Sequence, residues 1–191
     1  RIFAAVGVNK LRITGGEPLV RANLPELIER LSLIEGIEDI ALTTNGYLLP
    51  KYANELKEAG LNRLTISLDS IDEEIFKKMS GRPQGPANTL EGIKLATELG
   101  FSPIKINVVV QRAVNDHTLV DTARYFKGTG AIVRFIEFMD VGTKNGWELS
   151  EVVTSKEVIE MIGSEFPLEP VDPNYTGEVA SRYRYKDGDG E

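Results

Sequence analysis

The sequence predicts an α/β protein whose parallel strands form an open, partial barrel around a polar ligand. Short runs rich in β-branched residues alternate with longer segments of helical spacing, and that alternation is typical of a parallel sheet with right-handed crossovers. Each run also has one apolar and one polar face, and cations recur on the polar face. These three observations determine the expected fold class and indicate an anionic ligand.

Capping signals and apolar spacing mark the helices between and after the strands. Ser70 with Glu73, and Thr154 with Glu157, have the spacing of a capping box, in which two side chains satisfy backbone N–H groups at a helix start. The predicted strands are residues 11–14, 40–44, 63–68, 104–111 and 131–138. The predicted helices are residues 25–34, 51–59, 72–79, 90–99, 118–126 and 158–162.

Side-chain alternation within the strands separates the candidate architectures, because residues two apart in a strand share a face. A doubly wound sheet is covered by helices on both faces and needs two apolar faces. A closed eight-stranded barrel fills its interior with branched apolar side chains. Here one face of each run carries polar residues, which favours an open barrel that encloses a polar ligand. Those residues are Arg12, Thr14, Thr43, Asn45, Thr65, Ser67, Asp69, Lys105, Asn107, Gln111 and Arg134.

Three cations, Arg12, Lys105 and Arg134, lie on this polar face in three different strands. A buried cation is costly unless it is paired or binds an anion. One interpretation is a structural ion-pair network; the other is a phosphorylated ligand held by convergent cations. The side chains that would add neutral hydrogen bonds to sugar or carboxylate groups are Thr43, Asn45, Ser67 and Asn107.

The segment Gly15-Gly16-Glu17-Pro18 ends the first predicted strand. Two glycines let a backbone approach a ligand closely, and proline stops further strand pairing. The carboxylate of Glu17 and nearby carbonyl groups would suit an ammonium group. An ordinary turn from strand to helix is the alternative interpretation.

Composition excludes several classes of function. The 191 residues carry a formal net charge of -7, with no cysteine and one histidine. The chain therefore has no disulfide, no thiolate metal site and no cysteine ligand for an iron–sulfur cluster. Its acidity argues against nucleic acid and anionic membranes as partners. Because its first residues lack the apolar stretch of a secretory signal, we expect a cytoplasmic location.

Taken together and in order, five segments resemble a known family, the GTP 3',8-cyclases (molybdenum cofactor biosynthesis protein A) of the radical S-adenosylmethionine (SAM) superfamily. The ordered set is far more specific than the glycine turn alone, and the likeness runs on to Gly142, Asn145-Gly146-Trp147 and Gly177-Glu178-Val179-Ala180. The five segments are Leu11–Pro18, Leu42–Gly46, Ile66–Asp69, Lys105–Val109 and Arg134–Asp140.

The resemblance implies a partial (β/α)6 TIM-like barrel of the radical SAM type, with the first strand missing and strands two to six present. It also implies a lyase reaction in which a radical derived from SAM abstracts the ribose 3' hydrogen of GTP, so that C3' attacks C8 of guanine. The family's SAM contacts match Gly15, Gly16, Glu17, Ser67 and Met139, the last through its backbone. The GTP contacts match Arg12, Thr43 and Lys105, with Arg134 as a further contact.

The sequence also departs from the family pattern, because it lacks the residues that hold the family's clusters. The family holds two [4Fe–4S] clusters through two groups of three cysteines, and this sequence has none. We therefore interpret the chain as a core fragment, inactive alone, with residues 1–168 forming the barrel. Residues 169–191 would form an extension towards the second cluster region, and residues 187–191 would be disordered. The edge left by the missing first strand would favour a homodimer.

Two other functions are compatible with the residues. One is a cysteine-free module that binds nucleotide and SAM without radical chemistry. The other is an unrelated phosphate-binding barrel enzyme, for which Asp69 and Glu137 are the candidate acid and base. No residue of the chain is required as a general base in the radical reaction.

Overall fold

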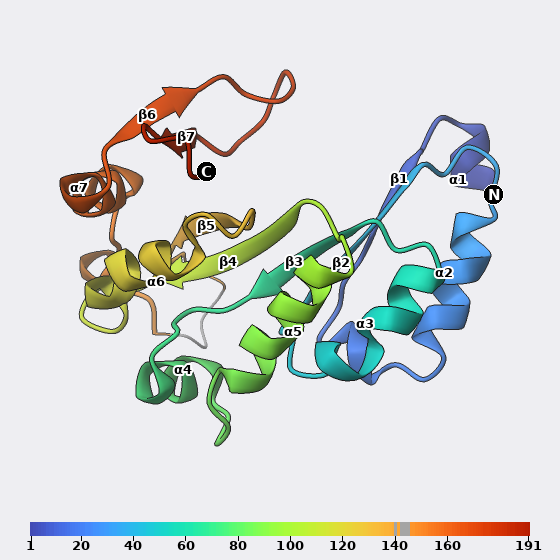
Figure 1. Cartoon of the computed structure of the whole chain (residues 1–191), viewed down its shortest axis with the longest axis horizontal. Coiled ribbons are helices and arrows are strands. Elements are labelled where there is room, and N and C mark those ends of the chain that lie inside the picture. Colours follow the sequence, from blue (N-terminus) through green and yellow to red (C-terminus); the bar gives the residue numbers. More distant parts are fainter. Residues whose placement is uncertain (140, 142–145) are drawn as a thin grey trace. The chain divides into compact units, whose positions relative to one another are not determined.

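The computed structural model describes residues 1–139, 141 and 146–191, so Asp140, Gly142 and Asn145 of the family-like segments lie outside the described residues. Contacts divide the chain into two compact units, Arg1–Leu68 with Gly85–Ile106, and Asp69–Gln84 with Asn107–Glu191. One five-stranded sheet has the order β1-β2-β3-β4-β5 (Figure 1). Its strands are β1 (Lys10–Ile13), β2 (Asp39–Thr44), β3 (Arg63–Ser67), β4 (Ile104–Val110) and β5 (Ile132–Glu137).

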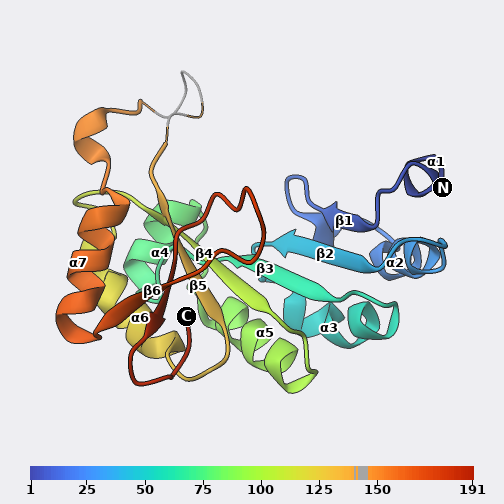
Figure 2. The same ribbon diagram turned by 90° about the horizontal axis from the view of Figure 1, so that it is seen from above.

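In the first unit, β1, β2 and β3 pair in parallel, as the alternation predicts. The register sets Arg12 beside Ala41 and Thr43 beside Thr65. Helices α2 (Leu24–Ser32), α3 (Leu49–Glu58) and α5 (Ala87–Glu98) line one face of these strands (Figure 2). The short elements α1 (Ile2–Ala5) and η1 (Pro18–Val20) flank β1. The largest buried side chains of this unit are Ile28, Ile40, Leu42, Leu49, Leu56, Leu61, Leu64, Ile66, Leu68 and Ile106.

Burial along β4 alternates strictly and confirms the two-faced strand. Residues 104, 106, 108 and 110 are buried, whereas Lys105, Asn107 and Val109 are half-buried. Every predicted strand begins and ends within one residue of the observed one. Period-two patterning therefore locates the strands, and on β4 it also locates the polar side.

In the second unit, α4 (Glu73–Ser80) begins differently from the prediction. Asp72 is its N-cap and accepts a hydrogen bond from the Ile75 N–H, while Ser70 Oγ accepts from the Asp72 N–H. The capping box of Ser70 and Glu73 is therefore wrong, because Asp72 offers the stronger acceptor nearer the helix. The box of Thr154 with Glu157 is confirmed at the start of α7 (Ser155–Glu165).

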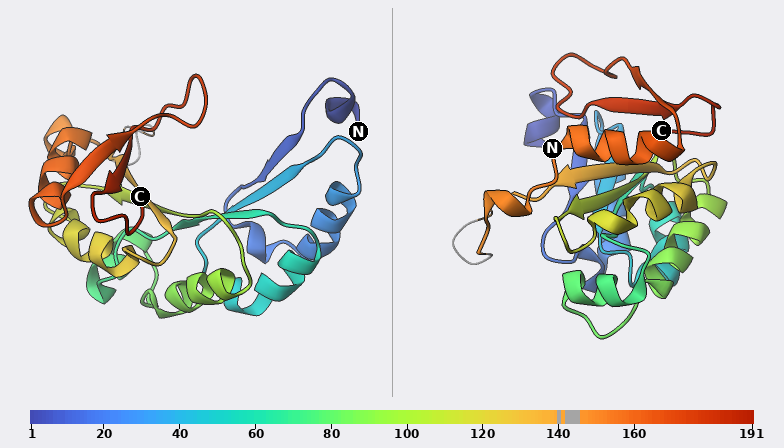
Figure 3. Two further views of the ribbon diagram at one scale, coloured as in Figure 1. Left: turned by 45° about the horizontal axis from the view of Figure 1, so that its top comes forward. Right: turned by 90° about the vertical axis from the view of Figure 1, so that its left-hand side faces the viewer.

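The rest of the second unit contains η2 (Asp116–Thr118), α6 (Leu119–Phe126), η3 (Leu149–Glu151) and a hairpin. Helices α6 and α7 lie side by side (Figure 2). The hairpin pairs β6 (Leu168–Val171) with β7 (Arg182–Tyr185) in antiparallel register (Figure 3).

The last residues are anchored, so the expected disorder of residues 187–191 is wrong. Lys127 Nζ lies 2.7 Å from carboxylate oxygens of both Asp187 and Asp189. Arg182 donates to both carboxylate oxygens of Glu191 at 2.7 and 2.6 Å. Composition alone suggested a trailing tail because it does not reveal that these acidic side chains meet cations distant in sequence.

No helix among the described residues is long and apolar enough to cross a membrane.

Gly92 marks a close approach between helices, because it is buried and a Cβ there would lie 2.9 Å from Leu49 Cβ and 3.2 Å from the Gly46 carbonyl oxygen. We expect Gly92→Ala to destabilise the fold by about 1–3 kcal/mol through overpacking. The matched control is Gly163→Ala in α7, where the added methyl meets no atom within 4 Å and better helix propensity stabilises by up to about 1 kcal/mol. Denaturant unfolding would measure both; equal effects would contradict the packing.

Glu157 provides the clearest pH dependence of folding stability. Hydrogen bonds from the Thr154 N–H, then from Arg112 and the Thr154 hydroxyl, lower the pKa of Glu157 from 4.5 to about 2. A lowered pKa in the folded state adds stability above pH 4.5 that is lost as the pH falls towards 2. We expect this part of the slope of unfolding free energy against pH to vanish in Glu157→Gln. An NMR titration of the Glu157 carboxyl that gives an ordinary pKa would contradict it.

Candidate functional site

The end of the sheet in the first unit brings together a cation and two hydroxyl groups from three strands. Arg12 on β1 donates through Nη1 to Thr43 Oγ1 at 3.1 Å and to Thr65 Oγ1 at 3.2 Å. Thr43 is half-buried on β2, and Thr65 on β3 is 4% exposed. The parallel register explains the arrangement, because it places the two threonines opposite each other.

Arg63 on β3 provides a comparison with Arg12, because Arg63 has a carboxylate partner. Arg63 forms a two-pronged ion pair with Asp39, with Nε donating to Oδ1 at 2.8 Å and Nη2 donating to Oδ2. Among the described residues, by contrast, Arg12 has no carboxylate partner. Its side of the sheet therefore offers an uncompensated cation to an anionic ligand.

Glu17 joins the carboxyl ends of β1 and β2. Its carboxylate accepts from the Leu19 N–H at 2.9 Å, the Thr44 hydroxyl at 2.7 Å and the Asn45 N–H at 2.7 Å. These bonds use most of the acceptor capacity of a carboxylate. The glycine turn is thus both the start of η1 and a fixed connection between two strands, which residue spacing alone does not reveal.

Gly15 and Gly16 present open backbone beside this connection. Gly15 has a φ of 146°, which favours glycine, and both residues are exposed. A Cβ built on either residue meets no atom within 4 Å. A ligand can therefore approach the main chain at this turn.

The turn after β2 is held from several sides. The Gly46 N–H donates to Thr44 Oγ1 at 3.0 Å, and Thr89 Oγ1 on α5 donates to the Asn45 carbonyl at 3.1 Å. The Asn45 side chain accepts from the Tyr47 N–H at 3.0 Å. This side-chain oxygen therefore stabilises the turn. The sequence predicts that Asn45 hydrogen-bonds a ligand, whereas in the structure its side-chain acceptor bonds the Tyr47 N–H.

Two further predicted ligand residues lie in the first unit. Ser67 is the last residue of β3 and is exposed, and Lys105 is half-buried on β4. In the first unit the structure brings Arg12, Thr43 and Thr65 into direct contact. The role of Thr65 was not predicted, although its position on the polar face was the available signal.

The second unit contains a buried polar network built from Asp69, Val109 and Asn115. Asp69 Oδ1 accepts from the Val109 N–H at 2.9 Å, and fully buried Asn115 donates to the carbonyls of Asp69 and Val109 at 2.7 and 2.8 Å. Burial raises the pKa of Asp69 above 3.8, and the Val109 bond offsets part of that rise. Glu137 accepts from the Ser155 hydroxyl and N–H, which lowers its pKa. Both candidate acid–base groups therefore have structural partners.

The remaining predicted ligand residues also belong to the second unit. Arg134 is half-buried on β5, and Met139 is 56% exposed just beyond that strand.

Trp147 donates through Nε1 to the Phe138 carbonyl at 3.1 Å. Asn107 Oδ1 is buried and has no hydrogen-bond partner among the described residues.

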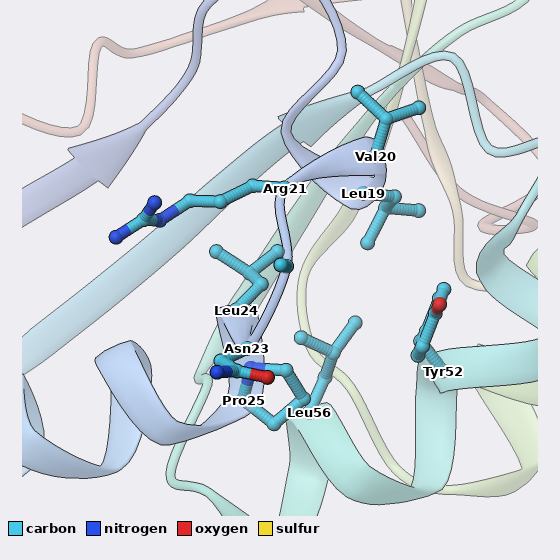
Figure 4. Close-up of a pocket in the computed structure, with 9 residues that line it drawn as sticks. Leu19, Val20, Arg21, Asn23, Leu24, Pro25, Tyr52 and Leu56 are labelled. Atoms are coloured by element: carbon cyan, nitrogen blue, oxygen red, sulfur yellow. The ribbon is translucent and has the colours of Figure 1, made fainter.

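Two pockets among the described residues are lined by other residues than the predicted ligand contacts. One, of about 90 Å³, lies between η1, the start of α2 and α3; Figure 4 shows Arg21 extended away from its apolar wall of Leu19, Leu56 and Tyr52. The other, of about 460 Å³, includes Asp72 and His117 in the second unit. The His117 side chain is exposed there.

Replacing Glu17 with glutamine tests the connection between the strand ends. The amide nitrogen would face either the Asn45 N–H or the Leu19 N–H and Thr44 hydroxyl, so at least one donor loses its acceptor. We expect Glu17→Gln to destabilise the fold by about 1–3 kcal/mol in denaturant unfolding. Glu26→Gln, on the exposed side of α2 where Glu26 forms an ion pair with Arg30, is the control and should cost under about 1 kcal/mol. Equal costs would contradict a structural role for Glu17.

Family models match nearly the whole chain. The family described as the Radical SAM superfamily matches residues 1–126, and the family described as Molybdenum Cofactor Synthesis C matches residues 131–191. Curated relatives include a GTP 3',8-cyclase of Xanthomonas campestris pv. campestris (strain B100), 53% identical over all 191 residues. One from Staphylococcus epidermidis (strain ATCC 35984) is 49% identical over the same length. The chain spans 56% of the length of both relatives.

Solved structures agree with these matches. A radical SAM methyltransferase from Sphaerobacter thermophilus superposes with a TM-score of 0.63 at 14% identity, over 82% of this chain and 48% of that one. Methylornithine synthase superposes with a TM-score of 0.61 at 16% identity, with the same coverage. At these identities the likeness concerns the fold, and it confirms the predicted α/β architecture of the radical SAM type. Since the superfamily match covers about two thirds of the residues, the chain belongs to the radical SAM superfamily.

Proposed function

We propose that this chain is the part of a GTP 3',8-cyclase that binds GTP and SAM, and that the whole protein is a lyase of molybdenum cofactor biosynthesis. Identity near 50% over the full chain to relatives of that name supports the reaction class. The observation that carries the proposal is Arg12, whose guanidinium spans Thr43 and Thr65 and has no carboxylate partner among the described residues. A nucleoside triphosphate is an anion suited to such a cation.

The proposed GTP contacts are Arg12, Thr43, Lys105 and Arg134. The first two already form one hydrogen-bonded group on neighbouring strands, which favours a pre-formed anion contact. Lys105 and Arg134 would add positive charge from β4 and β5. These residues would bind and orient GTP by charge and hydrogen bonding.

The proposed SAM contacts are Gly15, Gly16, Glu17, Ser67 and Met139. The open space above Gly15 and Gly16 fits the approach of a SAM amino-acid group to the backbone. Separately, in the second unit, the buried side-chain oxygen of Asn107 has no donor among the described residues and can accept a hydrogen bond from a ligand. Glu17 would contribute mainly by holding the turn, and SAM would supply the radical chemistry in the whole protein, where a one-electron reductant from outside this chain would cleave it.

An iron–sulfur cluster does not fit the residues of this chain. The sequence has no cysteine, and the described residues contain no cluster of three or more metal-ligating side chains. We therefore propose that the isolated chain is inactive. The alternative function, a binding module without radical chemistry, is also compatible with the lack of cysteine. Reductive cleavage of SAM by the purified chain would overturn both the proposed inactivity and this alternative.

We also propose a cytoplasmic protein that does not bind nucleic acid. Strand β1 stands at the end of the sheet order and pairs with β2. A homodimer through the other edge of β1 stays a prediction, which the mass of the protein in solution tests.

The change Arg12→Met tests the GTP site. A hydrogen bond to a charged group contributes about 1.5–3 kcal/mol, so we expect GTP affinity to fall by about 10- to 150-fold in calorimetric titration. The control is Arg30→Met on α2, which removes the same charge from an exposed ion pair with Glu26. The GTP affinity of Arg30→Met should match that of the wild type. No binding by the wild type, or equal binding by both variants, would contradict the proposed site.

A further inference from the structure

Arg12 uses only part of its hydrogen-bonding capacity on the protein. A guanidinium has five N–H donors, and the two of Nη1 are the ones directed at Thr43 and Thr65. No other described group accepts a hydrogen bond from Arg12. The edge formed by Nε and Nη2 is therefore available, and such an edge matches two oxygens of a phosphate group.

Thr43 and Thr65 contribute differently to this arrangement. Thr43 is half-buried, so its hydroxyl can contact both Arg12 and a ligand. Thr65 is 4% exposed, and its neighbours Leu64 and Ile66 on β3 are also buried. The Thr65 hydroxyl is therefore within reach of Arg12 but shielded from a ligand.

We propose that Thr65 is a positioning residue, which orients the Arg12 guanidinium so that its free edge receives a phosphate group of a nucleoside triphosphate. The inference rests on the proposed function. A long arginine side chain loses rotamer freedom when it binds an anion. Two hydroxyl groups on adjacent, registered strands restrict that freedom beforehand, and Thr65 is the fixed one of the pair because β3 is buried around it.

The test compares Thr65→Val, which removes the acceptor at nearly constant shape, with Thr65→Ser, which keeps it. Calorimetric titration would use GTP, inorganic triphosphate and guanosine with the 191-residue protein. We expect Thr65→Val to lose roughly tenfold in affinity for GTP and for triphosphate, equivalent to about 1.4 kcal/mol, with guanosine binding unchanged. Thr65→Ser should stay within about twofold of the wild type, since it restores the acceptor.

A double variant separates positioning from general damage to the fold. In the Arg12→Met background, Thr65→Val should produce no further loss, because Thr65 acts only through Arg12. Additive losses, equal affinity of wild type and Thr65→Val for GTP, or a matching loss for guanosine would each overturn the inference. Failure of the wild type to bind GTP would instead overturn the proposed function and, with it, the phosphate contact.

A measurement on the wild type covers the case in which Thr65→Val does not fold. NMR of the Arg12 guanidinium without ligand should show slow rotation about the Cζ–Nη1 bond, because both Nη1 protons are held. Free rotation would overturn the inference without any variant.

Discussion

The carboxylate of Glu17 ties the end of β1 to the end of β2, and the position of the exposed glycine turn depends on that connection. Three donors converge on it, from the Leu19 N–H, the Thr44 hydroxyl and the Asn45 N–H. The same Thr44 hydroxyl accepts from the Gly46 N–H, and Thr89 of α5 holds the Asn45 carbonyl. The open backbone of Gly15 and Gly16 is therefore attached to a firmly bonded framework, which is what a ligand contact through the main chain requires.

Charge is arranged differently at the two ends of β2 and β3. Near their beginning, Asp39 and Arg63 neutralise each other. Further along, Arg12 meets two hydroxyl groups, and no described carboxylate neutralises it. Hydroxyl acceptors orient a guanidinium without cancelling its charge, so the cation stays available to a phosphate. This contrast within one set of paired strands explains why the geometry favours a ligand-binding role for Arg12 over an ion-pair role.

Much of the fold could be predicted from the sequence because period-two patterning is a direct consequence of strand geometry. It located all five strands and placed Arg12, Thr43 and Lys105 on their polar side. The pattern could not reveal contacts that depend on the register between strands, such as Arg12 with Thr65. It also misassigned roles where a nearer acceptor existed, as at Asp72, and where distant charges meet, as between Lys127 and the last residues. Family resemblance supplied candidate roles for Gly16, Ser67 and Met139 that side-chain chemistry alone does not specify.

The proposed binding of GTP and SAM is tested most directly by a map of backbone amide NMR shifts on addition of GTP, and separately of S-adenosylhomocysteine as a non-reactive analogue of SAM. We expect GTP to shift resonances around Arg12, Thr43 and Lys105. The SAM analogue should shift those of Gly15, Gly16 and Ser67. Shifts confined to the pocket beside Asp72 and His117, or no shifts with either ligand, would contradict the proposed binding.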